Sequence, residues 1–461
     1  MQLKTLTAIL PLLATASAFP SLVSRENDST PSNKSKTCVV PAGGSNATDD
    51  TPAINKAFMD CAKDGTVVFE EGVDYFVMTP FRATNLSNVD IHLKGNIHLP
   101  QDIPTVQAIV NATGTAWLSG VWMSLQGDDV SWYGSKNVSS GWIYAYGQAW
   151  WDKNAENPTG TGLLGRPHLA NFELNNAYID GWKVRKPIAW NMAISGTNFT
   201  IKKTIIDAFT SGGFPFNTDG FDIMADGVVI DGFTVSNGDD AVAIQSGAAN
   251  VLVQNGYIGH HSHGMSIGSL GQNQGLFASV SNVTIRDITV DGAVYASRIK
   301  SWVGGQGLVS NVTYENFRLN NVTFPIFVTQ TYFNQGSQQS QIENGAVTGR
   351  PNNSSVILKD ISFRNFAGNI NYYDPGDRSC VSDPCWYDAS ISDRENPGTH
   401  SVVLECSNST TCSGFTMENI QVFPQPVLEP NVICINVGEE SNPDLGFRCP
   451  GGNYNGTFVA V

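Results

Sequence analysis

The segment GVVIDGFTVSN at residues 227–237 decides the fold, because other parts of the chain repeat its pattern at the same phase. Two of these repeats are NVLVQNGYIG at 250–259 and NVTIRDITVDG at 282–292. Each starts at an Asn or Gly turn and continues with alternating β-branched residues, which indicates a short strand with a buried face. Similar units recur from about residue 85 onward at intervals of roughly 22 to 45 residues, the range of solenoid repeats.

These repeats predict an all-β chain that folds as a right-handed parallel β-helix, a solenoid with disulfide-containing caps. Asparagine side chains at the entry turns of successive coils would hydrogen-bond along the stack, while Val and Ile fill its interior. A β-sandwich is the alternative for short strands at regular spacing. We favour the β-helix because asparagine recurs at the same position of each unit.

The N-terminal residues are typical of a secretory signal. An apolar run follows Lys4 and ends in the small-residue sequence Ala-Ser-Ala at 16–18. We therefore expect a signal peptide over residues 1–18, a flexible leader over 19–40 and a single catalytic domain over 41–461. The protein should be secreted, extracellular and free of membrane association.

The chain has eight cysteines, an even number that suits disulfide formation in an oxidising compartment. No two of them show the C-x₂-C spacing of a metal site, and we expect neither a metal nor a cofactor. Asn-x-Ser/Thr sequons along the chain, such as those at Asn282 and Asn311, agree with export. Neighbouring cysteines are expected to pair: Cys38 with Cys61, Cys380 with Cys385, Cys406 with Cys412, and Cys434 with Cys449.

The formal net charge of −15 at pH 7 argues against a nucleic-acid partner, which would require a basic surface. An acidic protein that acts on an acidic polymer needs a local basic patch at its site, or a low working pH that discharges both partners. We expect a monomer.

Four short motifs follow one another at intervals close to one coil. The separation from Asp219 to Asp240 is 21 residues, and that from Asp240 to His263 is 23. Equivalent positions of consecutive coils lie about 4.8 Å apart, so these side chains should gather on one face of the solenoid. The motifs are Asn217-Thr218-Asp219-Gly220, Gly238-Asp239-Asp240, Ser262-His263-Gly264 and Arg298-Ile299-Lys300.

Clustered carboxyl groups can provide both the acid and the base of glycoside hydrolysis. Three crowded carboxylates resist simultaneous ionisation, which raises the pKa of one of them and creates a proton donor. Arg298 and Lys300 lie on the same side of their strand, where they suit the carboxylate of a uronic acid. A single Gly-Asp-Asp would indicate only a turn, but four motifs in coil-spaced order favour a catalytic site.

In their order the motifs resemble the polygalacturonase family, glycoside hydrolase family 28. The resemblance implies hydrolysis of pectic polysaccharide with inversion of the anomeric configuration. It also implies that Asp240 is the general acid and that Asp219 and Asp239 are bases that activate water. His263 would support the acid.

The same resemblance implies the substrate contacts. Arg298 and Lys300 would bind the sugar on the leaving-group side, Tyr332 would line that subsite, and Asn217 matches the asparagine of the family motif. The SHG motif followed by SLGQ at 269–272 is similar to exo-acting members, which implies release of terminal galacturonic acid. The chain departs from the family at Ala241, where many members carry a cysteine.

Other interpretations stay open at this point. An exo-acting rhamnogalacturonan hydrolase or an α-L-rhamnosidase of the same family is the close alternative, and a pectate lyase is a more distant one. Trp150 and Trp151 could stack on a sugar or fill the core of a loop. Trp302, directly after the Arg298–Lys300 strand, is assigned to the cleft, and Asp222 to a turn.

Overall fold

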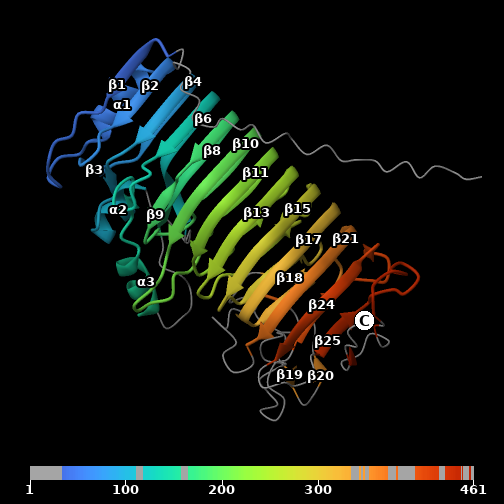
Figure 1. Cartoon of the computed structure of the whole chain (residues 1–461). Helices are drawn as coiled ribbons and strands as arrows, with labels where there is room; N and C mark the ends of the chain where they lie inside the picture. The colour runs from blue at the N-terminus through green and yellow to red at the C-terminus, as the bar shows by residue number, and fades with distance from the viewer. Residues whose placement is uncertain are drawn as a thin grey trace, which may run out of the picture.

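The computed structural model shows one stack of coils that runs from the N-terminal end to the C-terminal end of the chain (Figure 1). The predicted signal peptide and the predicted Cys380–Cys385 bridge lie outside the described residues. No helix among the described residues is long and apolar enough to span a bilayer. The structure describes residues 34–110, 118–156, 165–333, 342–343, 346–347, 352–371, 381–382, 400–424, 431–447, 449 and 456–457.

Twenty-four described strands form a single sheet that winds through the stack, and β19 (Ile342–Glu343) and β20 (Ala346–Val347) form a separate hairpin. Three described helices accompany the strands: α1 (Thr51–Asp60), α2 (Ile103–Ile109) and α3 (Gln148–Ala155). The strands of the large sheet are β1 (Lys36–Val39), β2 (Lys63–Phe69), β3 (Asp74–Phe76), β4 (Phe81–Leu93), β5 (Asn96–His98), β6 (Leu118–Gly134), β7 (Ile143–Tyr144), β8 (Arg166–Asp180), β9 (Lys183–Arg185), β10 (Met192–Asp207), β11 (Phe221–Ser236), β12 (Val242–Ile244), β13 (Ala249–Gly259), β14 (Met265–Leu270), β15 (Phe277–Asp291), β16 (Tyr295–Trp302), β17 (Gln306–Val322), β18 (Phe324–Tyr332), β21 (Ser355–Ile370), β22 (His400–Glu405), β23 (Cys412–Ser413), β24 (Thr416–Pro424), β25 (Asn431–Ile435) and β26 (Gly456–Thr457).

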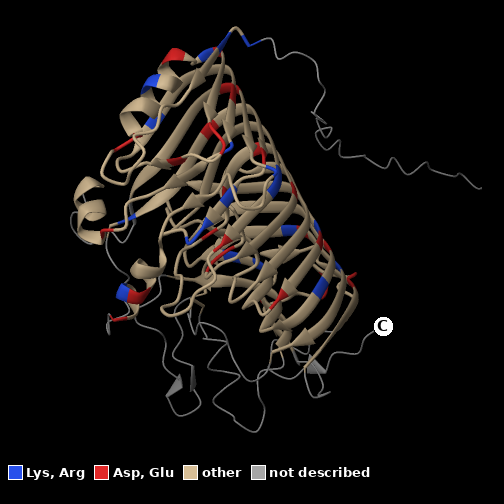
Figure 2. Cartoon of the chain, turned by 60° about the vertical axis from the view of Figure 1, so that its left-hand side comes forward, with Lys and Arg blue, Asp and Glu red and all other residues tan. Residues whose placement is uncertain are grey.

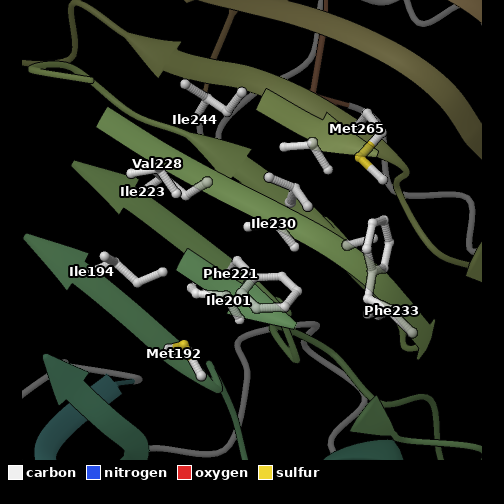
Figure 3. Close-up of a cluster of buried hydrophobic side chains, with 14 of the residues drawn as sticks. Met192, Ile194, Ile201, Phe221, Ile223, Val228, Ile230, Phe233, Ile244 and Met265 are labelled. Atoms are coloured by element: carbon white, nitrogen blue, oxygen red, sulfur yellow. The ribbon is translucent and has the colours of Figure 1, made fainter. Parts of the chain in front are cut away.

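Successive coils pair in parallel, so residues at equivalent positions stack along the axis. Ile223 of β11 is in register with Ile244 of β12, which is in register with Ile267 of β14, and Ile299 of β16 follows. All four side chains are fully buried, and Figure 3 shows Ile223 and Ile244 among the side chains of the interior. Parallel pairing between strands one coil apart confirms the parallel β-helix and rules out the β-sandwich.

Asparagines form the expected ladder along the outside of the stack. The side-chain amide of Asn311 donates to Asn282 over 3.0 Å, and that of Asn282 donates to Asn250 over 3.0 Å. Each of the three has a φ of 54° or 55°, in the left-handed region that asparagine tolerates better than most residues. The turn requirement and the ladder bonds together explain why asparagine recurs at this position.

The N-terminal end of the stack starts earlier in the chain than the sequence indicated. The flexible leader is predicted to extend to residue 40. In the structure, however, Lys36–Val39 forms β1 and pairs in parallel with β2. The Cys38–Cys61 disulfide holds this strand to the end of α1, which explains why the segment is ordered. Helix α1 buries Ile54 and Phe58 at this end of the core.

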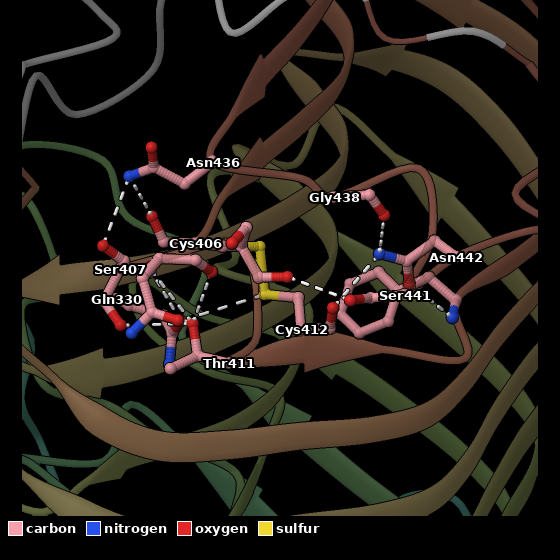
Figure 4. The surroundings of a disulfide bond; sticks show 12 residues. Gln330, Cys406, Ser407, Thr411, Cys412, Asn436, Gly438, Ser441 and Asn442 are labelled. Atoms are coloured by element: carbon pink, nitrogen blue, oxygen red, sulfur yellow. Dashed lines mark hydrogen bonds between the residues drawn. A yellow bond between two sulfur atoms is a disulfide. The ribbon is translucent and has the colours of Figure 1, made fainter.

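Two of the predicted disulfides lie toward the C-terminal end: Cys406–Cys412 and Cys434–Cys449. Figure 4 shows the first of these among polar side chains that satisfy the backbone of the last coils. The Asn436 amide donates to the carbonyl oxygen of Cys406 over 3.0 Å. Three of the four predicted bridges are thus confirmed.

Candidate active site

The four predicted motifs lie on neighbouring coils at one edge of the stack. The first three occupy the turns that lead into β11, β12 and β14, and Arg298 and Lys300 lie on β16. These elements pair in the order β11, β12, β14, β16, which brings the motifs together. In Figure 2 acidic and basic segments lie side by side in the middle coils, where the motifs are located.

Asp240 is at the centre of the cluster and faces two cations. Its Oδ1 accepts from Arg298 Nη2 at 2.5 Å and from Ser266 Oγ at 2.5 Å, and its Oδ2 accepts from Lys300 Nζ at 2.7 Å. The Asp240 side chain is only 2% exposed, and those of Arg298 and Lys300 are 3% and 6% exposed. Such a buried carboxylate with two cationic donors is stabilised in its charged form.

The same contacts act on Lys300. Burial and the neighbouring Arg298 would lower the pKa of Lys300, but the carboxylates of Asp240 and Asp239 raise it above its ordinary value. The ammonium group therefore stays charged throughout the physiological pH range. Its Nζ also lies 5.3 Å from the centre of the Tyr332 ring, a cation–π contact.

Asp239 forms a second centre with His263. Its Oδ1 lies 3.0 Å from His263 Nδ1, and its Oδ2 accepts from Asn217 Nδ2 at 3.3 Å. Burial would raise the pKa of Asp239, but the charges of His263, Lys300 and Arg298 hold it below its ordinary value. The Asp239 side chain is 17% exposed, which makes it more accessible than Asp240.

Asp219 differs from both in that its Oδ1 is buried and accepts no hydrogen bond from the residues that the structure describes. Burial, followed by the nearby carboxylates of Asp239, Asp222 and Asp240, raises the pKa of Asp219 well above its ordinary value. Burial likewise raises the pKa of Asp222 to about 8. The cluster thus contains two carboxyl groups with a raised pKa, Asp219 and Asp222, beside Asp240, which contacts two cations.

Comparison with known proteins identifies the family. A family model for glycosyl hydrolases family 28 matches residues 80–386. The chain is also 47% identical over 437 residues to a probable exopolygalacturonase C of Aspergillus terreus, an alignment that covers 95% of this chain and 97% of the relative. The chain belongs to glycosyl hydrolase family 28.

Solved structures agree with this family 28 fold. The chain superposes on an endo-xylogalacturonan hydrolase of Aspergillus tubingensis with a TM-score of 0.68 and 26% identity, over 91% of this chain and 100% of that one. An exopolygalacturonase of Thermotoga maritima superposes with a TM-score of 0.54 and 17% identity, over 87% of this chain and 91% of that one. The second match supports the fold alone.

The role of Asp240 as general acid stays a prediction, and its contacts differ from those expected of a proton donor. Arg298 and Lys300 both contact this carboxylate, and a proton there would disrupt two buried charge-assisted bonds. The predicted partner of the acid also differs, because His263 contacts Asp239. The carboxylates crowd as predicted, and burial with the neighbouring carboxylates raises the pKa of Asp219 well above its ordinary value.

The structure brings all eight predicted site residues into one region: Asn217, Asp219, Asp239, Asp240, His263, Arg298, Lys300 and Tyr332. Sequence reasoning missed two others. Arg166 donates to Asn217 Oδ1 over 2.6 Å, and Ser266 donates to Asp240. Neither belongs to a motif, although Ser266 lies one strand position inside β14, in register with Arg298.

Gly264 shows why the histidine motif requires its glycine. Its φ is +69°, and a Cβ atom there would lie 2.2 Å from the carbonyl oxygen of Tyr295. Any side chain would push this turn away from the next coil. The glycine therefore keeps His263 close enough to contact Asp239.

Two further interpretations are settled by burial. Trp150 and Trp151 of α3 are each 1% exposed, so they fill a core and do not stack on a sugar. Asp222, assigned to a turn, lies instead on β11 with 1% exposure, and Gln245 donates to its Oδ1. Its burial, followed by the neighbouring carboxylates of Asp240 and Asp239, explains the raised pKa described above.

The three carboxylate and imidazole groups of Asp239, Asp240 and His263 place one ligand atom each within 4.8 Å of one another. A metal ion there would meet the buried charges of Arg298 and Lys300 at close range, which opposes cation binding. The absence of a metal from the reaction stays a prediction.

Proposed function

We propose that this family 28 enzyme is an exo-acting polygalacturonase that releases terminal galacturonic acid from polygalacturonan with inversion. The observation that carries the chemistry is the carboxyl cluster of Asp219, Asp239 and Asp240 beside two buried cations. The exo assignment is supported by the relative from A. terreus, whose name is probable exopolygalacturonase C and which aligns over nearly the full chain.

We assign the proton donor to the Asp239–His263 pair. Asp239 is more accessible than Asp240, so it can reach a glycosidic oxygen in the cleft. Because nearby cations hold the pKa of Asp239 below its ordinary value, we place the proton of this pair on His263 in the free site, from which it passes to Asp239 over their hydrogen bond of 3.0 Å. His263 then serves to return a proton to Asp239 after each turnover.

Asp240 and Asp219 are assigned to the nucleophilic water. Asp240 accepts a proton from that water, and Asp219, whose raised pKa favours its protonated form, helps to orient it. A substrate carboxylate that binds Lys300 competes with Asp240 for this cation.

Two alternatives are less well supported. A rhamnose-releasing enzyme would also place a galacturonate in the leaving-group subsite, but the full-length relative at 47% identity is named for polygalacturonan. A lyase requires a base that removes a proton from carbon and a cation bound to the uronate, commonly calcium. The buried ion pairs of Asp240 offer no free carboxylate for calcium.

One set of assays tests this function. The wild-type enzyme is incubated with polygalacturonate, and NMR in the first minutes should show free galacturonic acid with inverted configuration. Retained configuration would contradict the mechanism, and a rapid fall of viscosity with mixed oligomers would contradict exo action. Unsaturated products that absorb in the ultraviolet and vanish with a chelator would indicate a lyase.

Two variants test the roles of the carboxyl groups. Asp239→Asn should lose at least about 10²-fold in kcat on polygalacturonate, the scale of general acid catalysis. It should retain more activity on an aryl galacturonide whose phenolate leaves without a proton. Asp240→Asn should be inactive on both substrates and partly rescued by azide, which needs no general base. The reverse pattern would return the acid role to Asp240.

We further propose secretion and a monomeric state. The signal-like residues 1–18 and three disulfide bridges support export, because such bridges persist in an oxidising compartment. Analysis of the culture medium and of the N-terminal residue of the mature protein tests the first proposal, and sedimentation tests the second.

A further inference from the structure

Two tryptophans differ from the others in their exposure. The chain has ten tryptophans, of which the structure describes eight. Trp190 and Trp302 are half-buried, whereas the other six are buried: Trp122, Trp132, Trp142, Trp150, Trp151 and Trp182. A half-buried aromatic ring keeps part of its surface accessible, and an accessible ring face can stack on a sugar.

These two tryptophans lie on opposite sides of the catalytic carboxyl groups. Trp302 is at the end of β16, on the C-terminal side, and its ring contacts that of Tyr332 at 5.2 Å between centroids. Tyr332 in turn contacts Lys300. This pair therefore belongs to the leaving-group side that the sequence motifs already indicated.

Trp190 is on the N-terminal side, one coil before Asp219. The backbone N–H of Asn191 donates to the backbone carbonyl oxygen of Asp219. The backbone N–H of Leu169 donates in the same way to the backbone carbonyl oxygen of Trp190. His168 and Trp190 thus occupy successive coils directly before the catalytic coil. Adjacent coils are about 4.8 Å apart, so Trp190 lies one coil and His168 two coils before Asp219.

His168 and Trp190 form one continuous surface. Their ring centroids are 4.5 Å apart, with an angle of 49° between the ring planes. Both residues are half-buried. The indole nitrogen of Trp190 is buried without a hydrogen-bond partner in the described part of the chain, so no polar contact with the protein accounts for its orientation.

Arg166 lies close to this surface and supplies a positive charge. It is 2% exposed and donates to the Phe216 carbonyl oxygen and to Asn217 Oδ1, both over 2.6 Å. Burial, and next the charge of Arg166, lowers the pKa of His168 to about 4. The imidazole is therefore neutral above that pH, and the surface combines uncharged aromatic rings with a nearby buried cation.

We propose that His168 and Trp190 form the subsite for the terminal galacturonate, the sugar that the enzyme releases. The ring faces contact the apolar face of the sugar, and the positive potential of Arg166 favours its carboxylate over a neutral sugar. This inference rests on the proposed function, because exo action makes a single terminal sugar the released product. The released sugar then binds on the N-terminal side of the carboxyl cluster, and the remaining polymer binds on the side of Trp302.

The test compares Trp190→Leu with Trp302→Leu. The two tryptophans are both half-buried and lie on opposite sides of the scissile bond. Binding of free galacturonic acid is measured by calorimetry, which needs no turnover, and its inhibition of hydrolysis is measured in parallel. Trp190→Leu should weaken galacturonate binding by about 3- to 10-fold, the loss expected for one aromatic contact. Trp302→Leu should change the galacturonate affinity by less than about twofold, because this substitution removes an equivalent contact on the other side of the scissile bond.

Conservative variants keep the test independent of folding. Trp190→Phe and His168→Gln retain most of the volume, and thermal unfolding confirms that each is folded. Both should weaken galacturonate binding in the same direction, and galactose should bind more weakly than galacturonate to the wild type. Unchanged galacturonate affinity in every folded variant at positions 168 and 190, or a larger loss in Trp302→Leu than in Trp190→Leu, would overturn the subsite.

The proposed function fails in a different way. A wild-type enzyme that releases no galacturonic acid from polygalacturonate contradicts the function whatever the variants do. Galacturonate binding that depends on Trp190 would then show that these rings bind the sugar, but not that they hold a released product.

Discussion

Lys300 Nζ lies 2.7 Å from Asp240 Oδ2, so the cation that is expected to bind the substrate is bound to a catalytic carboxylate in the free enzyme. Arg298 contacts the other oxygen of the same group. The substrate carboxylate must therefore replace an internal partner of these cations. This exchange couples uronate binding to the state of Asp240.

Lys300→Met tests this coupling. The variant should lose roughly 10- to 100-fold in kcat/KM on unesterified polygalacturonate, the range for a lost charge-assisted hydrogen bond. On methyl-esterified substrate, which carries no anion, the kcat/KM of the variant should fall much less. Kinetics on both substrates give the two ratios. Equal losses on both would show that Lys300 does not contact a substrate carboxylate.

Asp240→Asn should be markedly less stable as well as inactive. The substitution leaves the buried charges of Arg298 and Lys300 without their counter-ion, and breaking such a pair costs about 3–5 kcal/mol. Urea unfolding measures the change in the free energy of unfolding. Asp239→Asn is the matched control, because its partner His263 can become neutral. The free energy of unfolding should fall less in this variant than in Asp240→Asn. Similar stability losses in both variants would argue against the charged state of Asp240.

Asp222→Asn should change the pH dependence of stability. The pKa of Asp222 is about 8 in the folded protein and near its ordinary value of 3.8 in the unfolded chain. The folded state therefore holds this proton more tightly, and the stabilisation is complete below about pH 4 and is lost as the pH rises toward 8. The wild type should lose up to about 1.4 kcal/mol per pH unit relative to the variant in this window.

Urea unfolding of wild type and Asp222→Asn at pH 4.5, 6.0 and 7.5 measures this difference. Asp226→Asn, an exposed position on the same strand, is the control and should follow the wild type at every pH. Parallel curves for wild type and Asp222→Asn would mean that Asp222 titrates normally.

Asn282→Ala should destabilise the solenoid without affecting catalysis. It removes hydrogen bonds to Asn250 and from Asn311 and places alanine at a φ of 55°, with a combined cost of roughly 2–3 kcal/mol. Thermal unfolding and kcat on polygalacturonate are compared with those of Asn46→Ala. That control also removes a sequon but lies on an exposed turn outside the ladder. A stable Asn282→Ala variant would contradict a structural role for the ladder.

The β-helix, the asparagine ladder and the proximity of the four motifs could all be predicted from the sequence alone. The reason is geometric, because a solenoid repeats one backbone path, and residues separated by one repeat must stack. Asp219, Asp240 and His263 are each about one coil apart, so their proximity follows from their numbers in the chain. Neighbouring cysteines could likewise be paired, since short separations along stacked coils keep them close.

Only the tertiary structure decided which group contacts which. Whether Arg298 and Lys300 turn toward Asp240 or toward solvent depends on side-chain rotamers and on burial, neither of which a motif encodes. The motif by itself therefore could not decide which of its two carboxyl groups donates the proton. His168 and Trp190 carry no motif at all, and they become a candidate subsite because the coils place their half-buried rings beside Asp219. Local spacing determines stacking along a repeat, whereas charge partners and open ring faces depend on the packing around each side chain.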